Sequence, residues 1–141
     1  MKDRKYTTKD EGKTRALAAE FASKLEGGEV VELVGDLGSG KTTFVRGVAE
    51  ALGATARVKS PTFTIMNEYP LDHGQIKRIV HIDLYRFKDP AQLSALELED
   101  YQDDETVIFI EWPNVFHESV IEATQTIQFT FIDETTREIE M

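Results

Sequence analysis

The sequence predicts an α/β fold, and three features of its hydrophobic pattern support that class. A run of aliphatic and β-branched residues at 30–34, typical of a buried strand, leads directly into a glycine-rich segment and then into helical periodicity. Two later apolar segments, 79–83 and 106–111, also read as strands, and each ends in an acidic residue. A turn signal at 72–74 pairs the first of these with a preceding strand, which adds an antiparallel hairpin.

Composition predicts one soluble globular domain spanning residues 1–141. Hydrophobic residues make up 40% and charged residues 30% of the chain, which is long enough to bury a core. There is no run of 18 apolar residues and the first 13 residues are polar, so neither a membrane span nor a signal peptide is expected. The absence of cysteine excludes disulfides and favours a reducing cytoplasm. A net charge of −10 argues against direct binding of DNA or RNA, which needs a concentrated basic face.

The glycine-rich segment carries the pattern G-x-x-x-x-G-K-T, from Gly35 through Gly40 and Lys41 to Thr42. Its glycines allow positive φ angles that bring backbone N–H groups together around an anion, and the next helix adds its positive N-terminus. Lys41 is expected to contact the β- and γ-phosphates, and the Thr42 hydroxyl to bind magnesium. By chance the pattern occurs in about one in 200 chains of this length. The sequence therefore predicts a nucleoside-triphosphate site, with phosphate contacts from Gly38, Ser39, Gly40, Lys41, Thr42 and Thr43.

An amphipathic helix is expected before the first strand. Residues 8–11 have the spacing of a capping box, and apolar residues then recur at helical intervals until the glycines at 27–28. This helix should pack on the sheet; that Asp10 or Thr14 also reaches a nucleotide base is a further hypothesis. A second helix follows the glycine-rich loop and ends at Gly53.

A loop edge is expected after the second helix, where Pro61 forces Ser60 to be extended. In P-loop proteins a Ser or Thr shortly after the first helix of the motif often meets the γ-phosphate and magnesium, as in GTPase switch loops. Ser60 and Thr62 are candidates for this role, and an ordinary turn and strand start is the alternative. Residues 62–66 then alternate as the first strand of the hairpin.

The two strands that end in acids predict a magnesium–nucleotide site. Residues 79–83 have the form of a Walker B strand, whose Asp83 would hold the metal or its water shell near Thr42. Glu111 ends the second strand, so both carboxylates are expected at the carboxyl edge of the sheet, at a topological switch point. The alternatives are an ordinary strand-end charge for Glu111 and core packing for Trp112.

Other candidate residues carry weaker signals. His81 alternates onto the same face as Asp83, and a structural role is the favoured interpretation. Arg86 either stabilises phosphate charge or lies on the surface. His73 and His117 lack metal-ligand spacing, so zinc is not expected.

The remaining segments predict peripheral elements. A short helix begins at the Asp89-Pro90 signal and an acidic loop covers 99–105. A half-buried antiparallel strand is expected at 124–132, with a short return at 137–141.

Four motifs, in their order and spacing, resemble one family: GDLGSGKTT at 35–43, SPTF at 60–63, HIDLYR at 81–86 and EWP at 111–113. This is the TsaE (YjeE) family of small bacterial P-loop ATPases, which are needed to make the threonylcarbamoyladenosine modification of tRNA (t6A). The likeness covers residues 8 to 137, nearly the whole chain.

The resemblance implies a three-layer P-loop NTPase-like fold with a mixed, mainly parallel central sheet, and ATP or ADP in the P-loop. It implies magnesium on Thr42 and Glu111 with Asp83 nearby, and a switch-like loop at 60–62 that senses the γ-phosphate. The further residues expected near the nucleotide on this basis are Asp10, Thr62, Trp112 and Arg137.

Family resemblance also implies partners and a mechanism. Members bind the TsaB–TsaD pair, and ATP hydrolysis resets that complex between turnovers; contact with tRNA is expected only indirectly. Lys41, Asp83 and Glu111 are the candidate catalytic residues, and hydrolysis by the isolated chain is expected to be slow. Two rival functions are a small-molecule kinase, which would need a basic lid, and a nucleotide-dependent binding module that does not hydrolyse.

Overall fold

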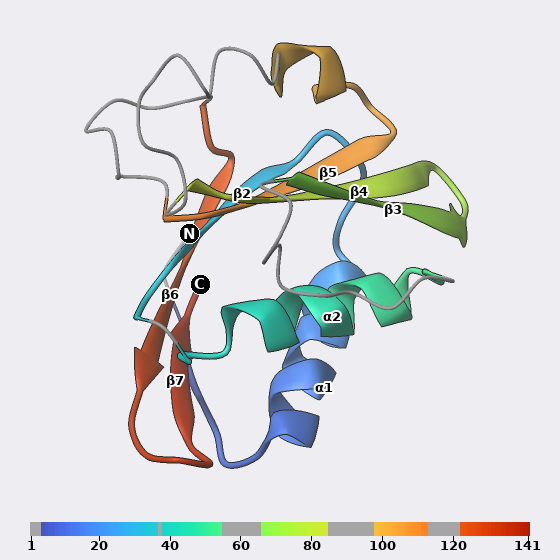
Figure 1. The fold of residues 1–141 in the computed structure, drawn as a ribbon. Coiled ribbons are helices and arrows are strands. Elements are labelled where there is room, and N and C mark those ends of the chain that lie inside the picture. Colours follow the sequence, from blue (N-terminus) through green and yellow to red (C-terminus); the bar gives the residue numbers. More distant parts are fainter. Residues whose placement is uncertain (1–3, 37, 55–65, 85–97, 113–121) are drawn as a thin grey trace.

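The computed structural model describes residues 4–36, 38–54, 66–84, 98–112 and 122–141. Figure 1 shows their arrangement. The helical elements are α1 (Glu11–Ala22), α2 (Lys41–Ala51) and the 3-10 turn η2 (Leu98–Tyr101). The strands are β1 (Lys5–Thr8), β2 (Val30–Val34), β3 (Met66–His73), β4 (Ile76–Asp83), β5 (Thr106–Glu111), β6 (Gln125–Phe131) and β7 (Arg137–Glu140).

In the described part of the chain the strands form one sheet in the order β1-β7-β6-β2-β5-β4-β3. The four central strands, β6, β2, β5 and β4, are parallel, whereas β3 and β7 run antiparallel to their neighbours. The turn at 74–75 joins β3 to β4 in the expected hairpin. The predicted α/β class, with a mixed and mainly parallel sheet, is therefore confirmed.

The helices α1 and α2 cover one face of the sheet, and η2 lies on the opposite side (Figure 1). Phe44 of α2 joins the helices to the sheet, because its ring packs 5.4 Å from that of Phe21 and 5.5 Å from that of Phe129. A second apolar cluster on the η2 side includes Ile82, Ile110 and Leu98. None of the helices in the described residues is long and apolar enough to cross a membrane.

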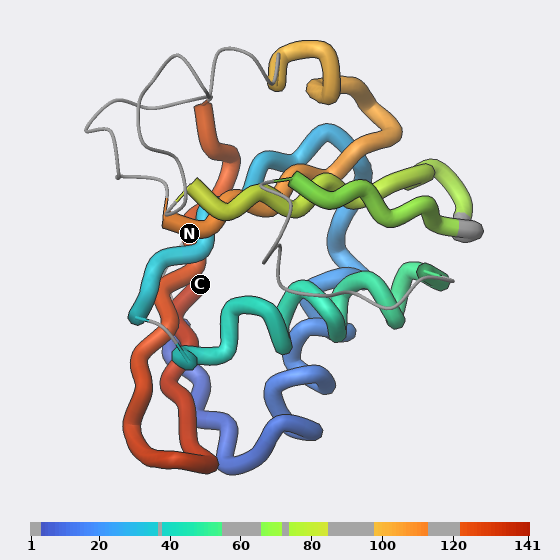
Figure 2. Tube along the Cα trace, in the orientation of Figure 1, coloured from blue at the N-terminus to red at the C-terminus, as the bar shows by residue number. Residues whose placement is uncertain are grey.

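The N-terminal segment differs from the prediction. Residues 5–8 form β1, which pairs with β7, so the two chain ends run side by side in Figure 2. Thr8 therefore does not cap the helix: its hydroxyl lies 2.7 Å from that of Thr14, and Asp10 caps α1 by accepting from the Lys13 amide at 2.7 Å. The helix ends at Ala22 and not at the glycine pair, which follows it in the chain after a short turn.

Several expectations lie outside the described residues. They concern the strand start at 62–65, the short helix after Asp89, the segment after Trp112, and the candidate residues Ser60, Thr62 and Arg86. Their assignments remain predictions.

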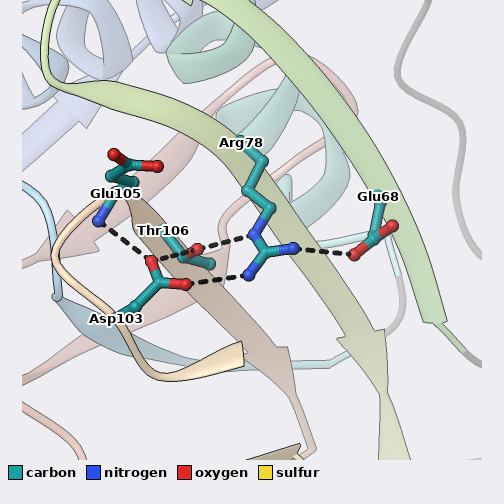
Figure 3. Close-up of polar contacts among 5 residues, drawn as sticks. All are labelled: Glu68, Arg78, Asp103, Glu105 and Thr106. Carbon is teal, nitrogen blue, oxygen red and sulfur yellow. Dashed lines mark hydrogen bonds and ion pairs between the residues drawn. The ribbon is translucent and has the colours of Figure 1, made fainter. Parts of the chain in front are cut away.

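A polar network fixes the edge of the sheet opposite the P-loop (Figure 3). Arg78 of β4 donates through Nε to the Thr106 hydroxyl at 2.7 Å and through Nη2 to Asp103 at 2.9 Å, and it lies 3.5 Å from Glu68 of β3. Asp103 also accepts from the Thr106 hydroxyl and from the Glu105 amide, and these hydrogen bonds, with the Arg78 charge, hold its pKa below the ordinary value. The network thus ties β3, β4 and β5 together and supports their register.

Candidate nucleotide-binding site

The loop between β2 and α2 forms a cradle of backbone groups. Gly35 has φ +155°, and a Cβ there would lie 2.5 Å from the Phe129 carbonyl oxygen, so only glycine fits against β6. Gly40, at φ +102°, is the N-cap of α2 and makes no side-chain capping bond. The first turn of α2 therefore lacks a side-chain cap, and such a helix N-terminus is suited to an anion.

Lys41 stands at the start of α2 and is largely buried, with 5% of the residue exposed. Its Nζ donates to the Gly35 carbonyl at 2.6 Å and lies 4.0 Å from the centre of the Trp112 ring. Trp112 has φ +59°, an uncommon conformation for a non-glycine residue, and it follows directly after β5. The end of β5 thus places an aromatic face against the P-loop lysine.

The electrostatic setting of Lys41 is mixed. Burial lowers its pKa below the ordinary value, while the charges of Glu111, Asp83 and Asp36 act in the opposite direction. These carboxylates face the amine without fully offsetting its lost solvation. An anion that brings negative charge to the amine would improve its environment.

The two candidate carboxylates come together as predicted. Asp83 and Glu111 are register partners at the carboxyl ends of the parallel strands β4 and β5. Because β5 lies between β4 and β2, Glu111 is on the strand next to the P-loop strand, and Asp83 is one strand further away. Glu111 is buried and Asp83 is half-buried.

His81 contacts one of these acids, which the sequence interpretation missed. Its Nε2 lies 3.0 Å from Glu111 Oε2, and its side chain is fully buried. The available signal was its alternation with Asp83 on β4, which placed both on the face that also carries Glu111.

The candidate residues surround one cavity with a volume of about 500 Å³. Most of the predicted residues line it: Asp10, Gly38, Gly40, Lys41, Thr42, Thr43, Asp83, Glu111, Trp112 and Arg137. Ser39 does not, because it is fully buried and its amide donates to Asp36 within the loop. The cavity is also lined by Glu11, Glu134 and Thr135, which were not predicted as site residues.

Arg137 attaches the β6–β7 turn to the P-loop. Its Nε donates to the Gly38 carbonyl at 3.0 Å, and its Nη1 donates to the carbonyls of Asp133 at 2.5 Å and Thr136 at 3.0 Å. The guanidinium also lies 4.5 Å from the centre of the Phe131 ring. The turn therefore forms one wall of the cavity.

The N-terminus of α1 forms another wall. Asp10 and Glu11 both line the cavity, and Glu11 pairs with Arg46 of α2 at 3.1 Å. Arg46 is thus engaged with an acid of the neighbouring helix.

The residues present fit a magnesium nucleotide. Thr42, Asp83 and Glu111 offer hydroxyl and carboxylate oxygens, the donors that magnesium prefers. The uncapped helix N-terminus and Lys41 suit phosphate, and the cavity volume is in the range of small-molecule sites.

A family model described as "Threonylcarbamoyl adenosine biosynthesis protein TsaE" matches residues 8–139. The chain belongs to the TsaE family. It is 39% identical to the tRNA threonylcarbamoyladenosine biosynthesis protein TsaE of Bacillus subtilis (strain 168) over 120 residues, covering 85% of this chain and 73% of that protein. It is 38% identical to the protein of the same name from Haemophilus influenzae over 112 residues, covering 79% of this chain and 68% of that protein.

Among solved structures, the fold of this chain is similar to that of Bacillus subtilis YdiB. That crystal structure superposes with a TM-score of 0.79 at 34% sequence identity, covering 99% of this chain and 84% of the other. Fold and family therefore agree, and the family is one of t6A biosynthesis.

Proposed function

We propose that this TsaE family member is a magnesium-dependent ATPase that acts in the t6A modification of tRNA. The observation that supports it best is that one cavity is lined by two sets of residues. Lys41 and Thr42 come from an uncapped helix N-terminus, and Asp83 and Glu111 come from the ends of neighbouring strands. Phosphoryl transfer to water requires positioning and charge stabilisation, and this arrangement supplies both.

Each residue has a distinct role in the proposed reaction. The loop amides and Lys41 bind the phosphates, and Lys41 moves from the Gly35 carbonyl to do so. Thr42 and Glu111 would hold magnesium, which supplies charge neutralisation at the phosphate oxygens. Asp83 orients the attacking water, directly or through the metal's water shell. Thr62 is expected to contact the γ-phosphate.

The walls of the cavity would bind the nucleoside. Asp10 at the start of α1 and Arg137 beside the P-loop lie on two of those walls. Trp112, whose ring centre lies 4.0 Å from Lys41 Nζ, would lie close to the bound nucleotide.

The proposed partners are TsaB and TsaD, whose complex this chain binds and resets through ATP hydrolysis. In the described part of the chain, Arg137 is the arginine that lines the cavity, and its hydrogen bonds go to backbone carbonyls. We therefore expect slow turnover by the isolated chain and acceleration when the partner complex completes the site.

ATP hydrolysis by the purified protein, alone and with the matching TsaB–TsaD pair, tests this function. Lys41→Ala serves as the control. Stimulation that disappears in the control supports a partner-gated ATPase. Turnover of the order of 10 per second by the chain alone would contradict the gating, and equal rates with and without partners would break the link to t6A synthesis.

Alanine replacement of Asp83 or Glu111 separates an ATPase from a nucleotide-dependent binding module. An ATPase loses hydrolysis in these variants. Turnover that survives both replacements, with nucleotide binding unchanged, would contradict the catalytic assignment.

A further inference from the structure

His81 is a buried polar side chain next to the site that has no role in phosphate or nucleoside binding. It lies on β4 two residues before Asp83, on the sheet face that carries the helices, with Phe109 as its register partner on β5. Both His81 and Phe109 are fully buried. The polar contact that the structure describes for the imidazole is the one between Nε2 and Glu111 Oε2, at 3.0 Å.

The direction of that hydrogen bond follows from the unpaired nitrogen. His81 Nδ1 is buried and has no hydrogen-bond partner among the described residues. If Nε2–H donates to an ionised Glu111, Nδ1 keeps only an unfilled lone pair. The reverse arrangement would bury an N–H donor without an acceptor and would protonate the acid beside Lys41. The first arrangement is therefore favoured.

Glu111 has a competing partner nearby. Lys41 lines the same cavity, and the charge of Glu111 opposes the lowering of the Lys41 pKa by burial, as expected for groups of opposite charge. Yet the hydrogen bond of Glu111 goes to His81, while that of Lys41 goes to the Gly35 carbonyl. A Glu111 side chain released from His81 would be drawn toward the lysine that phosphate needs.

We propose that His81 is a positioning residue for this site: by donating to Oε2 it fixes the orientation of the Glu111 carboxylate in the cavity and keeps that carboxylate from pairing with Lys41. The inference rests on the proposed function only for its catalytic consequence, because the orientation of Glu111 is a property of the chain alone. Outer-shell donors of this kind typically change metal affinity or activity by 10–100-fold.

Two substitutions separate the effect of losing the hydrogen bond from the effect of losing the volume of the ring. His81→Gln places an amide N–H near the position of Nε2, whereas His81→Leu fills similar space without a donor. His81→Asn, whose amide stops short of that position, replaces the leucine variant if the latter does not fold. Circular dichroism and urea unfolding establish that each variant is native.

Crystal structures of the variants test positioning without any need for hydrolysis. Glu111 should keep its conformer in His81→Gln and change it in His81→Leu. An unchanged Glu111 in His81→Leu would overturn the proposal, whether or not the protein is an ATPase.

Kinetics and calorimetry with ATP test whether the orientation of Glu111 affects hydrolysis and magnesium-dependent binding. In the presence of the TsaB–TsaD pair, kcat/KM should fall at least about tenfold in His81→Leu, while His81→Gln stays within about threefold of the wild type. The gain in ATP affinity on adding magnesium should be lost in His81→Leu only. Equal damage in both variants would contradict the role of the donor. A wild-type protein that does not hydrolyse ATP would refute the proposed function and leave the crystallographic result to decide the role of His81.

Discussion

At the scale of single residues, the site is built around a lysine that is held in an unfavourable environment. Lys41 is 5% exposed, and burial lowers its pKa despite three surrounding carboxylates. The adjoining Trp112 adopts φ +59°, which also costs conformational energy. Buried charge and an unusual backbone angle are tolerated where they prepare a binding site, commonly at the expense of stability.

Replacement of Lys41 by methionine should therefore have opposite effects on binding and stability. A lowered pKa means that the unfolded chain binds the proton of Lys41 more tightly than the folded chain, so the charge opposes folding at neutral pH. Lys41→Met should raise the melting temperature and weaken ATP binding at least about tenfold, or 1.4 kcal/mol. Calorimetry and thermal unfolding measure the two effects.

The matched control is Lys77→Met, at an exposed lysine near the opposite edge of the sheet. It should leave ATP affinity unchanged. A Lys41→Met protein with wild-type ATP affinity would show that the P-loop lysine does not bind the phosphates.

The helices α1 and α2 pack closely against each other at Gly47. A Cβ at Gly47 would lie 2.7 Å from the Ala18 Cβ and 3.0 Å from the Arg15 Cα. The two helices approach closely at this point because α2 carries a glycine there. This contact also sets where the N-terminus of α1 meets the cavity.

Gly47→Ala should destabilise the protein although alanine is the better helix former. Overpacking lowers the free energy of unfolding by about 1–3 kcal/mol, and the higher helix propensity of alanine raises it by up to about 1 kcal/mol. We therefore expect a net decrease of about 1–2 kcal/mol. Urea denaturation measures it. Combined with Ala18→Gly, which removes one clashing methyl group, the loss should be smaller than the sum of the single effects. A Gly47→Ala protein at least as stable as the wild type would contradict this packing.

The polar network around Arg78 leads us to predict that the stability of the protein depends on pH (Figure 3). The pKa of Asp103 is below its ordinary value of 3.8, chiefly through the hydrogen bonds from the Thr106 hydroxyl and the Glu105 amide. Since the folded pKa is the lower one, the stabilisation is complete above the unfolded value and is lost as pH falls through the folded value. Asp103→Asn should thus destabilise the protein at about pH 7, with a penalty that shrinks between about pH 5 and pH 3.

Urea unfolding of both proteins across that pH range is the measurement. Asp104→Asn is the control, because Asp104 is an exposed neighbour for which the described residues provide no side-chain hydrogen bond. A penalty for Asp103→Asn that is constant with pH, or equal to that of the control, would argue against the network.

For the whole molecule, local pattern predicted the central elements well. The strands β2, β4, β5 and β6 and the helix α2 lie where hydrophobic periodicity and glycines place them. Strand β1 was missed because its four residues, Lys5–Thr8, are mostly polar and depend on pairing with β7 at the other end of the chain. Periodicity carries no information about such a distant partner.

The sequence allowed the proximity of only some of the candidate residues to be predicted. Asp83 and Glu111 could be brought together from sequence because parallel strands align their carboxyl ends. The contributions of Glu134 and Thr135 could not, because they come from the β6–β7 turn, which is far from the P-loop in sequence although Arg137 bonds to Gly38. The His81–Glu111 contact likewise depends on the register of two strands that are distant in sequence.

The overall charge makes the local cation at the P-loop important. The chain carries a net charge of −10, and two of the cavity walls present the acids Asp10, Glu11 and Glu134. Under the proposed function, a nucleoside triphosphate would add further negative charge, and its binding would depend on Lys41, the loop amides and a divalent cation. Binding without magnesium should accordingly be much weaker.

The most direct test of the proposed magnesium–nucleotide site is calorimetric titration of ATP into the purified protein and into Glu111→Gln, each with and without magnesium. We expect saturable binding of one ATP per chain. In the wild type, magnesium should tighten binding at least about tenfold, or 1.4 kcal/mol, whereas it should have little effect in the variant. Binding that is absent, or that responds to magnesium equally in both proteins, would contradict the assignment of this cavity as a magnesium–nucleotide site.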